Sequence, residues 1–228
     1  MTVDHSHDVA EWAQSFALLM CRLLSGCIES KGRAVLAVSG GSSPTPCLAK
    51  LSEADLDWAK VTVLPVDERW VPVSSPQSNE RLIRSTLLQN RAASARFLSL
   101  YCDAPTPAEG EATIERRLQA IAPGPDFAVL GMGLDGHTAS WFPGTPELER
   151  CLRTSQLCCA SSATAEPAQR MTLSLHALLQ AQQLVLLYAG ADKHAVFDRA
   201  TDAVDASAMP VRAILHQDAV PVAVLSCY

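Results

Sequence analysis

The sequence predicts an α/β protein with a mainly parallel, doubly wound sheet and helices on both of its faces. Short apolar runs, each suited to one buried strand, alternate along the chain with longer segments in which apolar residues recur at helical spacing. Several runs end in glycines that lead directly into a helix, a junction typical of a modified Rossmann-like sheet. The 228 residues are 48% hydrophobic and 18% charged, so the chain can bury a sizeable core. We expect one α/β domain spanning residues 1–228.

The charge balance argues against nucleic acid and membranes as partners. The formal net charge is -6, the pI is about 5.5, and no long run of lysine or arginine occurs. No apolar stretch approaches the roughly 20 residues that span a bilayer. Residues 1–12 lack the basic and apolar parts of a secretory signal, so we expect a cytoplasmic protein.

The eight cysteines suggest neither a disulfide framework nor a zinc site. No two of them are spaced as C-x-x-C, and most lie inside apolar segments. Because no secretory signal is evident, we expect reduced cysteines that act as small side chains of the core.

The first part of the chain is expected to form a tail, a helix, a strand and a second helix. Residues 4–8 carry two histidines and two aspartates, which we interpret as a solvated tail that caps the following helix rather than as metal ligands. Apolar residues then recur at helical spacing over 9–27. Ala34–Val38 is compact and apolar, as expected of a buried strand, and a helix should begin at Pro44.

A glycine-rich turn, Ser39-Gly40-Gly41-Ser42, connects this strand to the second helix. Free backbone N–H groups at a helix start, together with the positive end of the helix dipole, suit a phosphate group. The turn is neither a Walker A loop nor the G-x-G-x-x-G fingerprint of dinucleotide-binding proteins. A plain turn between strand and helix is the alternative interpretation.

Charged residues follow the next expected strand, Lys60–Val66. Asp67, Glu68 and Arg69 come directly after it. Three charges at the end of a buried strand are costly unless they pair with each other or meet a ligand. The alternative to a ligand site is a structural Asp–Arg pair that closes a loop.

Two helices are expected before the central strand. The first is capped by Ser78 and Asn79 and should run to about Asn90, and a helix with a charged face is expected over 109–121. Capping by itself explains Ser78 and Asn79. Their place shortly after the charged strand end is what makes them of interest.

The most informative stretch begins with a buried strand, Phe127–Leu130, and continues into glycines at 131, 133 and 136. Glycine lets the backbone approach a ligand closely, so such a strand end usually forms a tight loop. His137 follows, at the carboxyl edge of the sheet, where ligands bind and where a histidine can transfer protons near neutral pH. The alternative is a tight turn in which the histidine only hydrogen-bonds the loop.

The rest of the chain continues the alternation of strands and helices. A lysine in the first turn of a helix opposes the helix dipole, so a nearby anion would explain Lys193, with a solvated lysine as the alternative. The expected elements are a short helix from Thr145-Pro146, strands at 157–160 and 170–174, a helix through Gln180, a strand at Gln183–Ala189, a helix after Gly190 to about Ala200, and a strand at 220–225.

The polar strand ends should converge on one site. In a parallel sheet the carboxyl ends of the strands share one edge, so this convergence follows from the fold. Together the segments offer backbone amides and cations for a phosphate, with a histidine and a carboxylate for proton transfer. The chain has no G-x-S-x-G motif for an activated serine. The converging segments are Ser39–Ser42, Asp67–Arg69, Asp135–His137 and Gly190–Lys193, with Arg170 near the last in sequence.

Several of these stretches together resemble the 6-phosphogluconolactonases. SGGS followed by Pro, DER-W-VP with a downstream SN, LGMGLDGHTASWFPG, RMTLS and GADKH occur in the order found in that family, from about residue 33 to residue 199. The D-G-H-T-A-S-x-F-P-G stretch is the most specific part. The related glucosamine-6-phosphate deaminases carry Asn-Glu-Pro where this chain has residues 140–143, Ser-Trp-Phe-Pro. The sequence is therefore more similar to the lactonase branch.

The resemblance implies a fold of the sugar-phosphate isomerase and lactonase type. It also implies hydrolysis of 6-phospho-D-glucono-1,5-lactone to 6-phosphogluconate without a metal or cofactor. By the same resemblance His137 is the general base, Arg69 orients the lactone or stabilises its developing charge, and Asp67 holds His137 or Arg69 in place. The phosphate is assigned to a set of amides, hydroxyls and countercharges: Ser39, Gly40, Gly41, Ser42, Arg170 and Lys193.

Two other functions stay open at this point. A deaminase or isomerase acting on an amino sugar phosphate would need a second carboxylate near His137, and Glu147 is the only candidate nearby in sequence. A non-catalytic sugar-phosphate sensor would need the cations but not the base, so the presence of His137 argues against it. The expected partner is a small-molecule sugar-phosphate lactone, and the expected assembly is a monomer or a weak homodimer.

Overall fold

A parallel sheet of seven strands forms the centre of the computed structural model, which describes residues 1–228. Its order is β1-β10-β9-β6-β2-β3-β5, and all neighbouring strands are parallel. The chain builds the sheet outward from β2 in one direction and from β6 in the other, so the predicted doubly wound sheet is confirmed. The strands are β1 (Thr2–Ser6), β2 (Ala34–Val38), β3 (Val61–Pro65), β5 (Arg96–Phe97), β6 (Phe127–Leu130), β9 (Gln183–Ala189) and β10 (Val222–Cys227).

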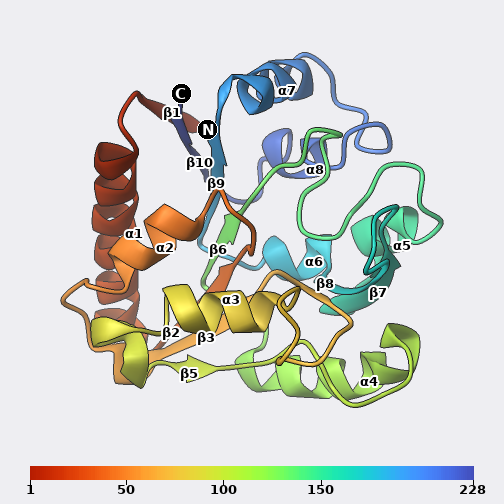
Figure 1. The fold of residues 1–228 in the computed structure, drawn as a ribbon, viewed down its shortest axis with the longest axis horizontal. Helices are drawn as coiled ribbons and strands as arrows, with labels where there is room; N and C mark the ends of the chain where they lie inside the picture. Colours follow the sequence, from red (N-terminus) through yellow and green to blue (C-terminus); the bar gives the residue numbers. More distant parts are fainter.

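Helices cover both faces of this sheet, and each face has its own hydrophobic core (Figure 1). The helices are α1 (Val9–Lys31), α2 (Thr45–Leu51), α3 (Asn79–Thr86), α4 (Pro107–Leu118), α5 (Leu148–Arg153), α6 (Leu175–Leu178), α7 (Ala191–Thr201) and α8 (Arg212–Leu215), with short 3-10 turns η1 (Trp58–Lys60), η2 (Asn90–Ser94) and η3 (Gln119–Ile121). Successive strand residues point to opposite faces. Leu36 therefore packs in the core with α1, α2 and α3, whereas Ala37 packs in the core with α4, α6, α7 and α8.

The longest helix, α1, follows its sequence signals. Apolar residues at every third or fourth position form its buried side. At its start, an oxygen of the Asp8 carboxylate accepts hydrogen bonds from the N–H groups of Ala10 (2.7 Å) and Glu11 (2.9 Å). At its end, Gly32 adopts a left-handed conformation with φ of 74°, which terminates the helix one turn beyond the expected boundary.

The N-terminal segment differs from the solvated tail that was expected. Thr2–Ser6 forms β1, an edge strand that pairs in parallel with β10 over its whole length. Four of its five residues are exposed, so no alternation of apolar and polar residues identifies it as a strand. Backbone pairing with β10, which only the folded sheet provides, makes it one.

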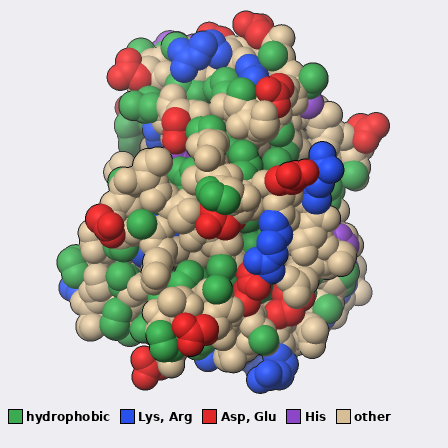
Figure 2. Space-filling model, turned by 90° about the vertical axis from the view of Figure 1, so that its right-hand side faces the viewer, with side chains coloured by type: hydrophobic (Ala, Val, Ile, Leu, Met, Phe, Trp, Pro, Cys, Tyr) green, Lys and Arg blue, Asp and Glu red, His purple; other side chains and the backbone are tan.

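Most other elements lie close to their expected positions. α3 ends at Thr86 instead of about Asn90, and α5 begins at Leu148 with Pro146 outside the helix. None of the helices combines the length and the apolar character needed to cross a bilayer. On the face shown in Figure 2, acidic and basic side chains are interspersed, so that face carries no continuous basic surface.

A second, antiparallel sheet, which the sequence does not predict, stands beside the first. It has the order β4-β8-β7 and consists of β4 (Asp67–Arg69), β8 (Gln169–Leu173) and β7 (Cys158–Ser162). Val66 joins the two sheets: its N–H donates to the Val38 carbonyl at 3.0 Å, and its carbonyl accepts from the N–H of Leu173 at 2.8 Å. Asp67–Arg69 therefore belongs to a strand that turns away from the main sheet immediately after β3.

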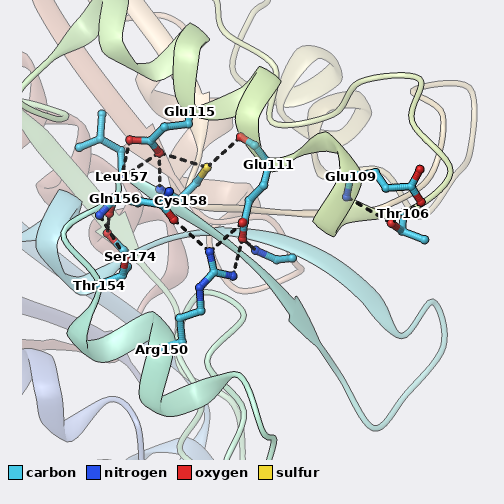
Figure 3. A network of polar contacts seen from close by, with 11 residues as sticks. Thr106, Glu109, Glu111, Glu115, Arg150, Thr154, Gln156, Leu157, Cys158 and Ser174 are labelled. Carbon is cyan, nitrogen blue, oxygen red and sulfur yellow. Dashed lines mark hydrogen bonds and ion pairs between the residues drawn. The ribbon is translucent and has the colours of Figure 1, made fainter.

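Two glutamates of α4 cover the outer edge of β7 (Figure 3). Glu115 accepts hydrogen bonds from the N–H groups of Leu157 (2.9 Å) and Cys158 (3.1 Å), and Glu111 accepts from the N–H of Ala160 at 2.6 Å. Arg150 of α5 donates to both oxygens of Glu111 at 2.7 Å. The outward backbone donors of Cys158 and Ala160 in this edge strand are thus satisfied within the chain, which makes pairing with another strand less favourable there.

Candidate active site

A cavity of about 220 Å³ opens at the carboxyl edge of the main sheet, beside β2 and β6. The order of strand addition reverses between these two strands, which is where open α/β sheets bind ligands. Only two of its 15 lining residues are hydrophobic. The lining consists of Ser39, Gly40, Gly41, Ser42, Ser43, Pro44, Asp67, Arg69, Asn79, Gly131, Met132, Gly133, His137, Ala139 and Lys193. All four segments that were expected to converge contribute residues to this cavity, whereas Arg170 does not line it.

The glycine-rich turn presents free donors to this cavity. The N–H groups of residues 40–43 donate no hydrogen bond within the chain, and α2 begins directly after them at Thr45. The Thr45 hydroxyl fixes the turn by donating to the Gly41 carbonyl at 2.9 Å. Ser39 contributes differently, because its hydroxyl is buried and accepts the N–H of Gly131 at 3.0 Å, which ties the ends of β2 and β6 together. The turn can cradle an anion with its backbone amides.

Gly40 also makes room for a side chain of α3. A Cβ atom at position 40 would lie 2.1 Å from Oδ1 of Asn79, so only glycine permits the observed packing. The Asn79 amide in turn donates to the Asp67 carbonyl at 2.8 Å. Asn79, interpreted from sequence chiefly as a helix cap, thus lines the cavity and links α3 to β4.

Lys193 reaches the cavity from the first turn of α7. Its Nζ donates to the Ser43 hydroxyl at 2.9 Å, which brings the start of α7 against the glycine-rich turn. Burial of the amine lowers the pKa of Lys193 from its ordinary value. A partly desolvated cation beside four free amides favours an anionic ligand. Sequence reasoning did not include Ser43, although it directly follows the Ser-Gly-Gly-Ser turn.

His137 pairs with Asp135 in the loop after β6. The two side chains meet at 2.6 Å between His137 Nδ1 and Asp135 Oδ1, and the same oxygen accepts the His137 N–H at 3.1 Å. Partial burial raises the pKa of Asp135, but the hydrogen bond and charge of His137 outweigh it, so that this pKa lies below its ordinary value. Phe142 packs against the imidazole with ring centroids 4.5 Å apart. The pair leaves Nε2 available for proton transfer.

Asp67 does not hold His137 or Arg69, and this expectation is corrected. Its carboxylate accepts the Ser140 hydroxyl at 2.6 Å and so braces the loop that follows His137. Arg69 is held instead by the Gln77 carbonyl, to which its Nη1 donates at 2.7 Å. Asp135 takes the place expected of Asp67 because its short side chain folds back within its own turn.

Glu68 has a structural part in this arrangement. It is fully buried, and its carboxylate accepts the N–H groups of Asn79 and Glu80 at 2.7 Å and the Ser78 hydroxyl at 3.1 Å. Burial raises the pKa of Glu68 to about 7 against the opposing effect of the hydrogen bonds from the backbone N–H groups of Glu80, Asn79 and Arg69. The side chain anchors the start of α3 to β4, so the three charges after β3 divide into one anchor and two cavity residues.

Arg170 lies apart from the phosphate candidates. It lines a second cavity of about 480 Å³, which adjoins the first and shares Asp67, Arg69, His137 and Ala139 with it. Residues 40–43 and Lys193 do not line this second cavity. Burial, with Arg69 nearby, lowers the pKa of Arg170. The two cavities therefore meet at His137, with the free amides and Lys193 on one side and Arg170 on the other.

Comparison with known proteins agrees with this geometry. The family described as glucosamine-6-phosphate isomerases/6-phosphogluconolactonase matches residues 7–223. The chain belongs to this family. It is 42% identical to a 6-phosphogluconolactonase of Rhizobium meliloti, over 87% of this chain and 86% of that protein. It is 40% identical to a 6-phosphogluconolactonase of Pseudomonas aeruginosa, over 91% and 88% of the two chains.

Solved structures of the family share the fold. A crystal structure of a 6-phosphogluconolactonase from Shewanella baltica superposes with a TM-score of 0.97 at 38% identity and covers 100% of this chain and 98% of that one. A monomeric glucosamine-6-phosphate deaminase superposes with a TM-score of 0.81 at 17% identity, over 98% and 97% of the chains, which shows the common fold alone. Both branches of the family thus use this sheet.

Proposed function

We propose that this protein hydrolyses 6-phospho-D-glucono-1,5-lactone to 6-phospho-D-gluconate, a step of the oxidative pentose phosphate pathway. The observation that carries the proposal is the shared cavity: an imidazole paired with a carboxylate opens into the same space as four free backbone amides and a lysine. Relatives 40% and 42% identical that bear the name 6-phosphogluconolactonase support it.

The phosphate of the substrate binds at the glycine-rich turn. The N–H groups of residues 40–43 supply donors in a fixed geometry, and Lys193 supplies the positive charge. The Ser43 hydroxyl, which accepts from Lys193 in the free protein, is positioned to donate to a phosphate oxygen when the lysine turns to the anion. This end of the site binds the substrate and leaves the reacting ring free.

The reaction takes place at His137. Its Nε2 takes a proton from a water molecule as the water oxygen forms a bond to C1 of the lactone. The C1–O5 bond then breaks, the imidazolium returns the proton to O5, and C1 becomes a carboxylic acid that ionises to the carboxylate. Asp135 fixes the tautomer with the proton on Nδ1 and stabilises the imidazolium, as the carboxylate does in hydrolytic triads.

Two neighbouring side chains complete the reaction end. Arg69 lines the cavity with His137, and its guanidinium suits the role of orienting the lactone carbonyl and stabilising the oxyanion. Asp67 acts through the protein by bracing Ser140, and so the loop that carries His137. Loss of Asp67 would therefore displace the loop that carries the base.

The deaminase alternative is less well supported. It requires a second carboxylate near His137, but Glu147 lines neither cavity. Its carboxylate instead accepts the Ser162 hydroxyl at 2.8 Å, at the end of β7. Nothing in the position of Glu147 suits it to proton transfer on a sugar held beside His137.

Six of the eight cysteines are buried and all eight are free, which supports a reducing, cytoplasmic setting. We also propose a single α/β domain, because both cores pack against the same seven-stranded sheet.

A monomer or weak homodimer remains our proposal for the assembly. Sedimentation velocity over a range of micromolar concentrations tests it, and a stable higher oligomer would contradict it.

A coupled assay tests the function. Glucose-6-phosphate dehydrogenase generates the lactone in situ, 6-phosphogluconate dehydrogenase reports its hydrolysis, and spontaneous ring opening is the blank. We expect acceleration well above the blank, lost in His137→Ala and retained in His176→Ala, which removes an exposed histidine of α6. Binding of 6-phosphogluconate without acceleration would instead indicate a sensor, and absence of both would indicate an amino sugar phosphate as the substrate.

A further inference from the structure

Arg170 is a buried cation whose hydrogen-bonding capacity the chain does not satisfy. Its side chain is among the most buried charged groups, with the residue 5% exposed, and both Nε and Nη1 are enclosed without a hydrogen-bond partner. Arg212, the other buried arginine, donates to three backbone carbonyls, the closest at 2.7 Å. An enclosed guanidinium with free donors is costly unless an anion meets it.

A second cation stands directly beside it. Arg69 of β4 is the register partner of Arg170 of β8, so the two arginines face each other across an antiparallel pair. Like charges in opposite positions destabilise a sheet. Neither arginine forms an ion pair with a carboxylate. Asp67, Glu68 and Glu166 lie near enough to Arg170 to favour its charged form, but none of them pairs with it directly. The two guanidinium groups are thus a concentration of positive charge without a direct ion-pair partner at the wall of the second cavity.

The position of Arg69 and Arg170 relative to His137 restricts which anionic group of a ligand the two arginines can bind. Arg69, Arg170 and His137 line the same cavity, whereas Lys193 and the free amides lie in the adjoining one. If the phosphate occupies the amides and Lys193, the anion at the arginines arises at the other end of the substrate. In a lactone hydrolysis that charge is the oxyanion on C1, which becomes the carboxylate of the product.

We propose that Arg69 and Arg170 form a second anion subsite, which binds the C1 oxyanion and then the C1 carboxylate, so that Arg170 contacts the reacting end and not the phosphate. This inference rests on the proposed function. It defines the substrate class as phosphorylated aldonic acids and their lactones, which carry an anionic or strongly polarised C1. A phosphorylated alditol, with a neutral alcohol at C1, leaves the two arginines unpaired and binds more weakly.

Isothermal titration calorimetry with two probes tests this subsite. 6-Phospho-D-gluconate and D-glucitol 6-phosphate share the phosphate and differ at C1, as carboxylate and alcohol. The wild type should prefer the phosphogluconate by roughly tenfold to a hundredfold, the range for charge-assisted hydrogen bonds to one group. Arg170→Met should abolish most of this preference while leaving the affinity for glucitol 6-phosphate unchanged. Arg153→Met, which removes an exposed arginine of α5, is the control with the same change in net charge.

Stability measurements separate this role from a structural one. Because Arg170 has no partner within the chain, we expect Arg170→Met to melt at or above the temperature of the wild type. Arg170→Lys keeps the charge but not the planar fork, and it should retain part of the preference. Arg170→Lys is also the variant to compare with the wild type if Arg170→Met does not fold.

Two results would overturn the subsite. An equal loss of affinity for both probes would make Arg170 a phosphate contact, and an unchanged preference in both variants would exclude Arg170 from ligand binding. The coupled assay of the wild type is independent of these outcomes. A wild-type protein that prefers phosphogluconate through Arg170 but does not accelerate lactone opening would retain the subsite and refute the proposed function.

Discussion

Gly133 and His137 lie so close together that a Cβ atom at position 133 would be 2.1 Å from Nδ1 of the imidazole. It would also be 2.7 Å from the Asp135 oxygen that pairs with that nitrogen. The lack of a side chain at Gly133 therefore creates the space in which the histidine and the carboxylate meet. A backbone hydrogen bond closes the loop at this point: the Gly133 N–H donates to the His137 carbonyl at 2.9 Å.

Gly133→Ala should lower kcat by about a hundredfold, because a displacement of the base by about 1 Å is enough for such a loss. The control is Gly26→Ala in α1, where an added Cβ has no neighbour within 4 Å. That control should retain full activity and gain roughly 0.5–1 kcal/mol in free energy of unfolding. Steady-state kinetics and urea denaturation measure both effects. A fully active Gly133→Ala variant would refute the role of the pair.

Asp135→Asn should lower kcat by two orders of magnitude or more, on the order seen when a triad carboxylate loses its charge. The asparagine amide can present either its oxygen or its NH2 group to Nδ1, so it no longer enforces the tautomer with the proton on Nδ1. It also lacks the negative charge that stabilises the imidazolium. Glu147→Gln makes the same chemical change at a carboxylate outside both cavities and should leave kcat within about twofold of the wild type. The coupled lactone assay compares the two. A large loss in Glu147→Gln would revive the deaminase interpretation.

Binding of 6-phosphogluconate should weaken at alkaline pH because of Lys193. Burial lowers the pKa of this amine below the ordinary lysine value of 10.5, so the charge is lost earlier than from a solvated lysine. A bound phosphate favours the charged form, and the dissociation constant should therefore rise as the pH passes through the lowered pKa. Calorimetric titrations from about pH 7 to about pH 10 measure this, since the phosphate is already doubly ionised there.

Lys193→Arg is the matched variant, because a guanidinium keeps its charge over this pH range. Its affinity should be nearly independent of pH. Lys193→Ala should bind weakly at every pH and mainly raise KM, as expected for a ground-state contact to phosphate. If the wild type and Lys193→Arg had the same pH profile, the titrating group would not be Lys193.

Much of the main sheet was predictable from local pattern. The runs at Ala34–Val38, Phe127–Leu130 and Gln183–Ala189 are strands within those bounds. Burial on both sheet faces leaves continuous apolar sequence throughout the first two strands and over residues 184–188 of the third. β1 was not predictable, since it is exposed and depends on β10 for its hydrogen bonds. β4 was not predictable either, because its three residues are all charged and pair only with β8.

In the candidate site, too, some features were predictable from the sequence and others were not. Convergence of the glycine-rich turn, His137 and Lys193 follows from sequence, because parallel strands place their carboxyl ends at one edge. The partners of individual side chains do not follow from it. Asp67, 70 positions from His137, braces Ser140, while Asp135 within the loop holds the imidazole.

By itself, the sequence determined the strand and helix alternation, the edge at which the polar residues meet and the family to which they belong. Only the tertiary structure decided that Asp135 holds His137, and that Arg170 stands opposite Arg69 away from the phosphate candidates. The physical reason is the sequence separation over which each kind of interaction acts. Periodicity and turn chemistry act over a few residues, whereas the second sheet and its buried arginine depend on pairing between strands about a hundred residues apart.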